Sequence, residues 1–192
     1  MLNSKRSRVR AAAGVGMAAV VATVGAVTFN ASAAEQAPVA PAAIGPDARA
    51  VSIPGIPAAI KPPKGSKPIS AFFVASGTQT YTCTGGIFTG ASVPEAQLIG
   101  TGGRVHHFGG PSWQSTRDGS LVTAAKKAES PRAGTIPELL LEVNSHSGSG
   151  IFSKATFINR LLTSGGTAPA GACTDGEKKA VPYGAIYVFW TN

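Results

Sequence analysis

The residues that could support chemistry are concentrated between positions 101 and 120. This segment holds two of the three histidines and one of the two tryptophans, together with a turn that carries an acid and a hydroxyl. Aromatic rings stack on sugars, and a few polar groups beside them orient a bound molecule. We therefore predict that His107, Trp113, Asp118 and Ser120 bind a ligand.

The same residue types allow enzymatic alternatives. A nucleophilic set could be drawn from His107, Asp118 and Ser120, but the sequence has no G-x-S-x-G elbow. Paired carboxylates for glycoside hydrolysis could come from Asp118, Glu138 and Glu142, although both glutamates are expected to face solvent. We assign no catalytic residue, and we keep as the alternative function a small secreted hydrolase or metal-dependent enzyme that uses His107 and Asp118.

Neither a metal nor another cofactor is expected. His106 and His107 are adjacent, so in a strand their side chains point to opposite faces and do not share one ion. One histidine with Asp118 and His146 stays open as a ligand set. However, the sequence has no H-E-x-x-H motif, no His/Cys cluster and no G-x-G-x-x-G nucleotide fingerprint.

Residues 1–34 have the parts of a secretory signal peptide. Four basic residues lie within the first ten positions, an uncharged apolar run follows at 11–29, and Ala-Ser-Ala at 31–33 matches a cleavage pattern. The run is long enough to span a bilayer, which makes an uncleaved anchor the alternative. Because the run is rich in Ala, Val and Gly and lacks Leu and Ile, we predict cleavage, secretion and no stable membrane insertion.

The net charge of +8 depends largely on this leader. Without residues 1–34 it falls to +4, and residues 69–192 contain nine basic and seven acidic side chains. A nucleic-acid-binding domain needs a basic stripe on its folded surface. The composition therefore predicts no nucleic-acid partner.

Residues 35–68 are predicted to be an extended linker. They carry eight of the 14 prolines, and proline lacks the backbone donor that helices and inner strands require. A partly polyproline spacer that holds the domain away from a cell surface is one interpretation, and a tail without a role is the other. Ile53, Ile56 and Ile60 could pin its end onto the domain.

Residues 69–192 are predicted to form one all-β domain. Segments rich in apolar, β-branched and aromatic residues alternate with Gly, Ser, Thr and Pro. The longest is Ile151 to Thr163, and Val181 to Thr191 has apolar residues on both faces. Residues 135–143 fit a helix start or a strand, and we favour the strand. The fold class is a single-domain antiparallel sandwich or barrel.

The two cysteines, Cys83 and Cys173, are predicted to form a disulfide. An even count in an exported protein favours pairing, and neither cysteine belongs to a C-x-x-C motif. In the chain-entropy model, a loop of this length is worth about 4–5 kcal/mol.

The domain also resembles a family of secreted proteins labelled domain of unknown function 3455, found in bacteria and filamentous fungi. Seven sequence pieces in order, and one cysteine, carry the resemblance. They are Gly77-x-Gln79-x-Tyr81-x-Cys83, Glu95-Ala96-x-Leu98, His107-Phe108-x-Gly110-Pro111-x-Trp113, Asp118-Gly119-Ser120, Ile136-Pro137-x-Leu139-Leu140-Leu141, Ile158-x-Arg160-x-x-Thr163-x-Gly165-Gly166, Cys173 and Val181-Pro182-Tyr183-x-Ala185-x-Tyr187-x-Phe189. The resemblance implies a secreted, β-rich single domain and no established activity. The sequence departs from it at Glu138, where an aromatic is expected, and at Ile186, where a polar residue is usual.

These observations together favour an extracellular binding or structural module at the cell surface or in the medium. A cell-wall polysaccharide is the partner we consider, since the predicted site combines aromatic and polar side chains with a low net charge. The sequence indicates no oligomeric state.

Overall fold

The structure, a computed structural model, describes residues 55–192. The predicted signal peptide at 1–34 and most of the predicted linker lie outside these residues. Among residues 55–192, no helix is long and apolar enough to cross a membrane. The elements are η2 (Ala58–Ile60), β1 (Lys67–Thr84), β2 (Ile87–Gly100), β3 (Gly103–Phe108), β4 (Ser112–Ser115), β5 (Leu121–Ser130), β6 (Glu138–Ser147), β7 (Phe157–Gly165) and β8 (Lys178–Thr191).

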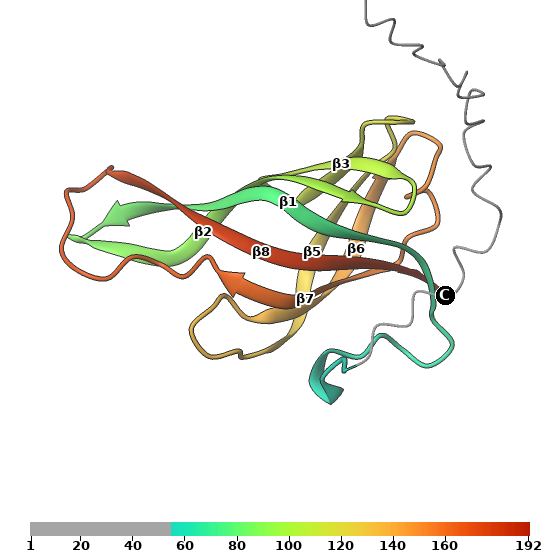
Figure 1. Ribbon diagram of the computed structural model, residues 1–192, viewed down its shortest axis with the longest axis horizontal. Helices are drawn as coiled ribbons and strands as arrows, with labels where there is room; N and C mark the ends of the chain where they lie inside the picture. Colours follow the sequence, from blue (N-terminus) through green and yellow to red (C-terminus); the bar gives the residue numbers. More distant parts are fainter. Residues whose placement is uncertain (1–54) are drawn as a thin grey trace, which may run out of the picture. The chain divides into compact units, whose positions relative to one another are not determined.

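The eight strands form one closed antiparallel barrel. Each strand pairs with its neighbours in sequence, and β8 pairs with β1 to close the ring (Figure 1). The predicted all-β antiparallel domain is confirmed, and of the two architectures considered the protein adopts the barrel. Strand β6 also confirms that the segment around residues 138–143 is a strand rather than a helix.

Inward-facing side chains fill the barrel. On β8, Tyr183, Tyr187 and Phe189 point into the core, whereas Ile186 and Val188 pack on the outer face. This alternation follows from the two-residue period of a strand and agrees with the two faces expected from the sequence. The core therefore takes one residue in two from each strand.

The strand predicted over residues 151–163 was too long. Residues 151–154 form a turn, and β7 begins only at Phe157. Phe152 is fully buried and stacks on Phe189, with the ring centroids 4.4 Å apart. Burying such a ring stabilises the fold by about 2 kcal/mol, which favours the turn that places it in the core over a longer strand.

A second apolar cluster lies on the outer face of β6, β7 and β8. Ile60 of η2 is fully buried there, against Leu140, Phe157 and Leu161. The side chain of Asn159 donates a hydrogen bond to the Ile60 carbonyl oxygen at 2.9 Å. The end of the proline-rich segment is thus packed onto the barrel.

Three strands continue beyond the barrel. Pairing of β2 with β3 covers only residues 96–100, and pairing of β7 with β8 ends at Tyr183. Residues 78–84 of β1, 87–94 of β2 and 178–182 of β8 therefore form a three-stranded extension, visible at the left of Figure 1. We call this extension the arm.

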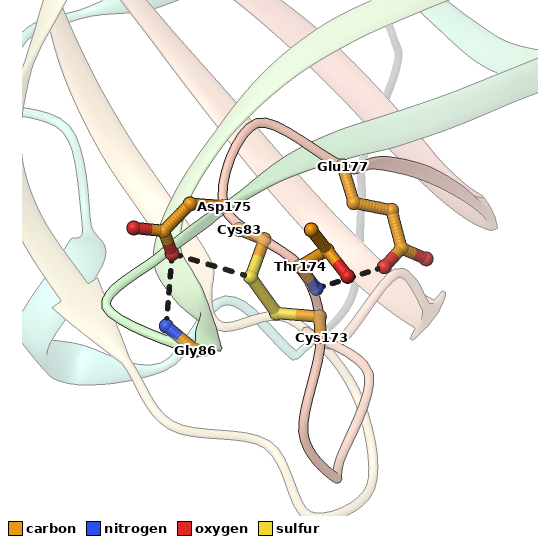
Figure 2. The surroundings of a disulfide bond; sticks show 6 residues. All are labelled: Cys83, Gly86, Cys173, Thr174, Asp175 and Glu177. Atoms are coloured by element: carbon orange, nitrogen blue, oxygen red, sulfur yellow. Dashed lines mark hydrogen bonds between the residues drawn. A yellow bond between two sulfur atoms is a disulfide. The ribbon is translucent and has the colours of Figure 1, made fainter.

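The Cys83–Cys173 disulfide ties the arm to the loop between β7 and β8, as Figure 2 shows, and confirms the predicted pairing. In the same loop, Asp175 accepts a hydrogen bond from the backbone nitrogen of Gly86 at 3.0 Å. Its carboxylate also lies 3.9 Å from the Cys83 sulfur. A disulfide sulfur carries no proton, so this second dashed line marks a contact only. The bridge holds a loop that has few apolar residues of its own.

Candidate functional site

Two neighbouring cavities lie where the arm leaves the barrel. The inner cavity, about 190 Å³, lies at the barrel mouth, and the outer cavity, about 360 Å³, lies between the arm and the loops that follow β5 and β7. Ser92, Leu139 and Arg160 line both, so the two cavities adjoin. The polar or aromatic residues of the inner cavity are Gln79, Ser92, His107, Trp113, Arg160 and Tyr187.

A stack of aromatic rings forms one wall of the inner cavity. His107 and Trp113 face each other across the β3–β4 pair, with ring centroids 4.4 Å apart and planes only 6° from parallel. Tyr187 contacts both rings edge-on. Since Trp113 is only 1 % exposed, it supports His107 from behind and presents no open platform.

The His107 imidazole is neutral at physiological pH. Its pKa is lowered to about 4, mainly by burial and in smaller part by the positive charge of Arg160, while the hydrogen bond to Ser112 works in the opposite direction. Nδ1 lies 2.8 Å from the Ser112 carbonyl oxygen and must therefore carry the proton. The other ring nitrogen, Nε2, is consequently a hydrogen-bond acceptor.

Arg160 brings a positive charge to the place where the cavities meet. Its Nε and Nη2 atoms donate to the Pro137 carbonyl oxygen at 3.1 and 2.8 Å. No carboxylate of residues 55–192 forms an ion pair with it. Burial raises the pKa values of Tyr183 and Tyr187, and the nearby guanidinium partly opposes this. Both hydroxyl groups, 3.3 Å apart, therefore stay protonated.

Two buried nitrogens of the inner cavity have no hydrogen-bond partner within the described residues. One is Nε1 of Trp113, and the other is Nε2 of Gln79, which lies near Tyr183 without bonding geometry. The Gln79 side-chain oxygen accepts a bond from Ser92 at 2.6 Å, which orients the amide. Unpaired buried donors cost free energy, so a ligand acceptor that reached them would stabilise the site.

Asp118 and Ser120 lie apart from both cavities. They follow β4, whereas the cavity residues Gly109 to Pro111 precede it. One Asp118 oxygen accepts from the Ser120 nitrogen at 3.0 Å and from its hydroxyl at 2.6 Å, and the other accepts from Ile151 at 3.1 Å. Although partial desolvation raises the pKa of Asp118, these bonds bring it down to about 2. The carboxylate thus joins two loops.

The structure therefore brings together two of the four predicted ligand residues, His107 and Trp113. The ligand-binding role of all four stays a prediction. The histidines of β3 lie as expected on opposite faces, since His106 points outward and contacts Glu95 at 2.6 Å. Nε2 of His146 donates a hydrogen bond to the Ala155 carbonyl oxygen at 2.7 Å. No group of three metal-ligating side chains occurs within residues 55–192.

The expectation that Glu138 faces solvent was wrong. Its side chain is buried, accepts a hydrogen bond from the Leu162 nitrogen at 2.7 Å, and lies 3.4 Å from the Arg132 guanidinium. Leu162 has a left-handed backbone (φ 49°) at an irregularity of β7, and the bond from its nitrogen holds that conformation. Glu142 is exposed as expected, beside Lys127.

Sequence reasoning missed Gln79, Arg160 and Tyr187 as site residues. Each belongs to one of the pieces on which the family resemblance rests, and this was the available signal. They lie on β1, β7 and β8, and only closure of the barrel brings them to one cavity.

The fold and the site define a disulfide-bonded, single-domain antiparallel β-barrel with a small polar and aromatic cavity at one mouth. Over residues 92–191, slightly more than half of the chain, the sequence matches a family model described as "Protein of unknown function (DUF3455)". The chain belongs to this family, which confirms the resemblance, and that description carries no activity. No curated protein and no solved structure matches the chain.

Proposed function

We propose that this domain is a secreted binding module whose inner cavity receives one ring-sized group of a larger carbohydrate ligand. The observation that carries the proposal is the cavity itself. It has an aromatic wall, polar groups that find no hydrogen-bond partner among residues 55–192, and a continuation into the outer cavity through Ser92, Leu139 and Arg160. Ligand sites characteristically combine an apolar lining with a few polar groups in this way.

The geometry favours end-on entry over stacking on an open surface. Trp113 is buried behind His107, so a flat polysaccharide surface has no exposed tryptophan to lie on. A terminal or branching sugar is small enough to enter the mouth, while the rest of the chain follows the outer cavity. A cell-wall polysaccharide of the secreted protein's surroundings is the partner we propose.

Binding is better supported than hydrolysis. The carboxylate that the alternative requires, Asp118, is engaged by Ser120 and Ile151 and lines neither cavity. Glu129, the one acid of residues 55–192 that lines the outer cavity, pairs with Lys126 at 2.8 Å. General acid–base catalysis needs such groups within hydrogen-bond reach of the substrate.

The test measures binding of soluble peptidoglycan fragments and chitin oligosaccharides by tryptophan fluorescence, with the disulfide formed. Val93 lines the inner cavity and is 57 % exposed, so Val93→Phe should narrow the mouth without disturbing the core. We expect at least one of these ligands to bind saturably, and Val93→Phe to weaken it about tenfold, or about 1.4 kcal/mol.

Ile87→Phe is the matched control. Ile87 is 63 % exposed on the same strand but lines neither cavity, so its replacement should leave the affinity unchanged. Absence of saturable binding in the wild-type protein, or an equal effect of the two substitutions, would contradict the proposal.

A further inference from the structure

Arg160 keeps donor capacity beyond its contacts within residues 55–192. A guanidinium has five N–H groups, of which two donate to the Pro137 carbonyl oxygen, and the Tyr187 hydroxyl also interacts with this side chain. Its remaining N–H groups lie on a side chain that lines both cavities. The planar fork of arginine matches the two oxygens of a carboxylate, to which it binds in bidentate fashion.

The charges around Arg160 leave its cation uncompensated. In the part of the chain that the structure describes, no acidic residue lines the inner cavity, and in the outer cavity Glu129 is paired with Lys126. Glu138, on the strand next to that of Arg160, accepts from Leu162 and contacts Arg132 instead. A single positive charge in a partly dehydrated cavity attracts an anion more strongly than one on the open surface.

The neighbouring groups describe the rest of the ligand. The unpaired Gln79 amide nitrogen and the Tyr187 hydroxyl line the same inner cavity and offer donors. The Ser92 hydroxyl also lines it, but its proton is already donated to the Gln79 side-chain oxygen, so it can only accept a further bond. Nε2 of His107 is a second acceptor, because the Nδ1 proton is committed to the Ser112 carbonyl. Acceptors of this kind fit hydroxyl groups and disfavour a second anionic oxygen. The site therefore combines one anion-binding cation with acceptors for hydroxyl groups.

We propose that the bound group is an acidic sugar, with its carboxylate on Arg160 where the two cavities meet and a ring hydroxyl donating to Nε2 of His107. This inference rests on the proposed function and narrows it to a class of ligand. An acidic sugar and a simple organic acid both offer a carboxylate to Arg160. Only the sugar also offers a ring hydroxyl to Nε2 of His107, so this second contact distinguishes the two kinds of ligand.

The experiment compares glucuronate, glucose and acetate as probes by tryptophan fluorescence at neutral pH, with isothermal titration calorimetry as a second readout. We expect glucuronate to bind at least tenfold more tightly than glucose and than acetate. In Arg160→Gln the preference for glucuronate over glucose should disappear, whereas Arg160→Lys should recover part of it. Arg104→Gln removes an exposed cation of β3 that lines neither cavity, and it should leave the preference intact.

Equal affinities for glucuronate and glucose would overturn the acidic-sugar inference. The proposed function would still stand in that case if peptidoglycan or chitin fragments bind. Acetate binding as tightly as glucuronate would overturn the sugar part and leave a simple anion site. If no saccharide binds at all, the proposed function fails as well. Unfolding of Arg160→Gln is checked by far-UV circular dichroism. If that variant does not fold, the glucuronate-to-glucose ratio of the wild-type protein and of Arg160→Lys decides the matter.

Discussion

Protonation of His107 is expected to destabilise the fold. The ring is buried, stacks on Trp113, and has a pKa of about 4 in the folded protein, against an ordinary value of 6.5. Between these two values the unfolded chain binds a proton that the folded state does not accept. The free energy of unfolding is therefore highest above pH 6.5 and falls as the pH decreases toward 4.

The expected loss follows from the difference between the two pKa values. One pH unit in this window corresponds to about 1.4 kcal/mol, so lowering the pH from 7 to 4 should cost about 3 kcal/mol. This is a large share of the about 5–15 kcal/mol by which a typical domain is stable. Asp118 contributes in a separate and lower window, because its pKa falls from 3.8 to about 2 and its stabilising effect is lost only there.

The assay is urea unfolding at several pH values between 7 and 4, followed by tryptophan fluorescence and circular dichroism with the disulfide intact. His107→Phe keeps an aromatic ring against Trp113 but does not titrate, so its stability should lose this part of the pH dependence. His106→Gln is the matched control, because His106 lies on the same strand and points to the outside.

Two results would refute the reasoning about His107. One is a change of less than about 1 kcal/mol in the wild-type protein between pH 7 and 4, since the linkage of a single group with this pKa requires more. The other is a pH dependence in His107→Phe equal to that of the wild-type protein. In either case burial does not hold the ring neutral.

Three further predictions concern the scaffold. Replacing Cys83 and Cys173 by serine should lower the free energy of unfolding by about 4 kcal/mol in urea, and a loss below about 1 kcal/mol would contradict the loop-entropy account. Ile60→Ala should cost about 2–4 kcal/mol because the side chain is fully buried, whereas an unchanged melting temperature would show that η2 does not stabilise the barrel. Gly100→Ala should lower the free energy of unfolding by about 2 kcal/mol or more, because the added methyl group would overlap a backbone oxygen of β1. Gly90→Ala is the control, since its methyl group would meet open space and should change the free energy of unfolding by no more than about 0.5 kcal/mol. Equal melting temperatures of the two variants would argue against the close approach at Gly100.

Local pattern predicted much of the secondary structure. Alternation along residues 181–191 placed Tyr187 and Ile186 on opposite faces, and the same rule separated His106 from His107. Pattern failed at residues 151–154, where apolar side chains are compatible with a strand. The burial of Phe152 against Phe189 is a contact between distant segments, and it favours a turn there.

The candidate site was predicted only in part. His107 and Trp113 are six residues apart and meet through a tight hairpin, so sequence proximity was a good guide. The same proximity was misleading for Asp118, which lies beyond β4 and bonds to Ser120 and Ile151. Nearness along the chain indicates nearness in space only within one hairpin, because each strand carries the chain from one end of the barrel to the other.

By itself, the sequence determined that the protein has an antiparallel all-β fold with a Cys83–Cys173 disulfide, since side-chain period, turn residues and cysteine count are local or compositional properties. The choice of barrel over sandwich and the cavity at its mouth were decided by tertiary structure alone. Both depend on the pairing of β1 with β8, whose residues are separated by about a hundred positions. That closure brings Gln79, Arg160 and Tyr187 to one place, and the burial it creates lowers the pKa of His107.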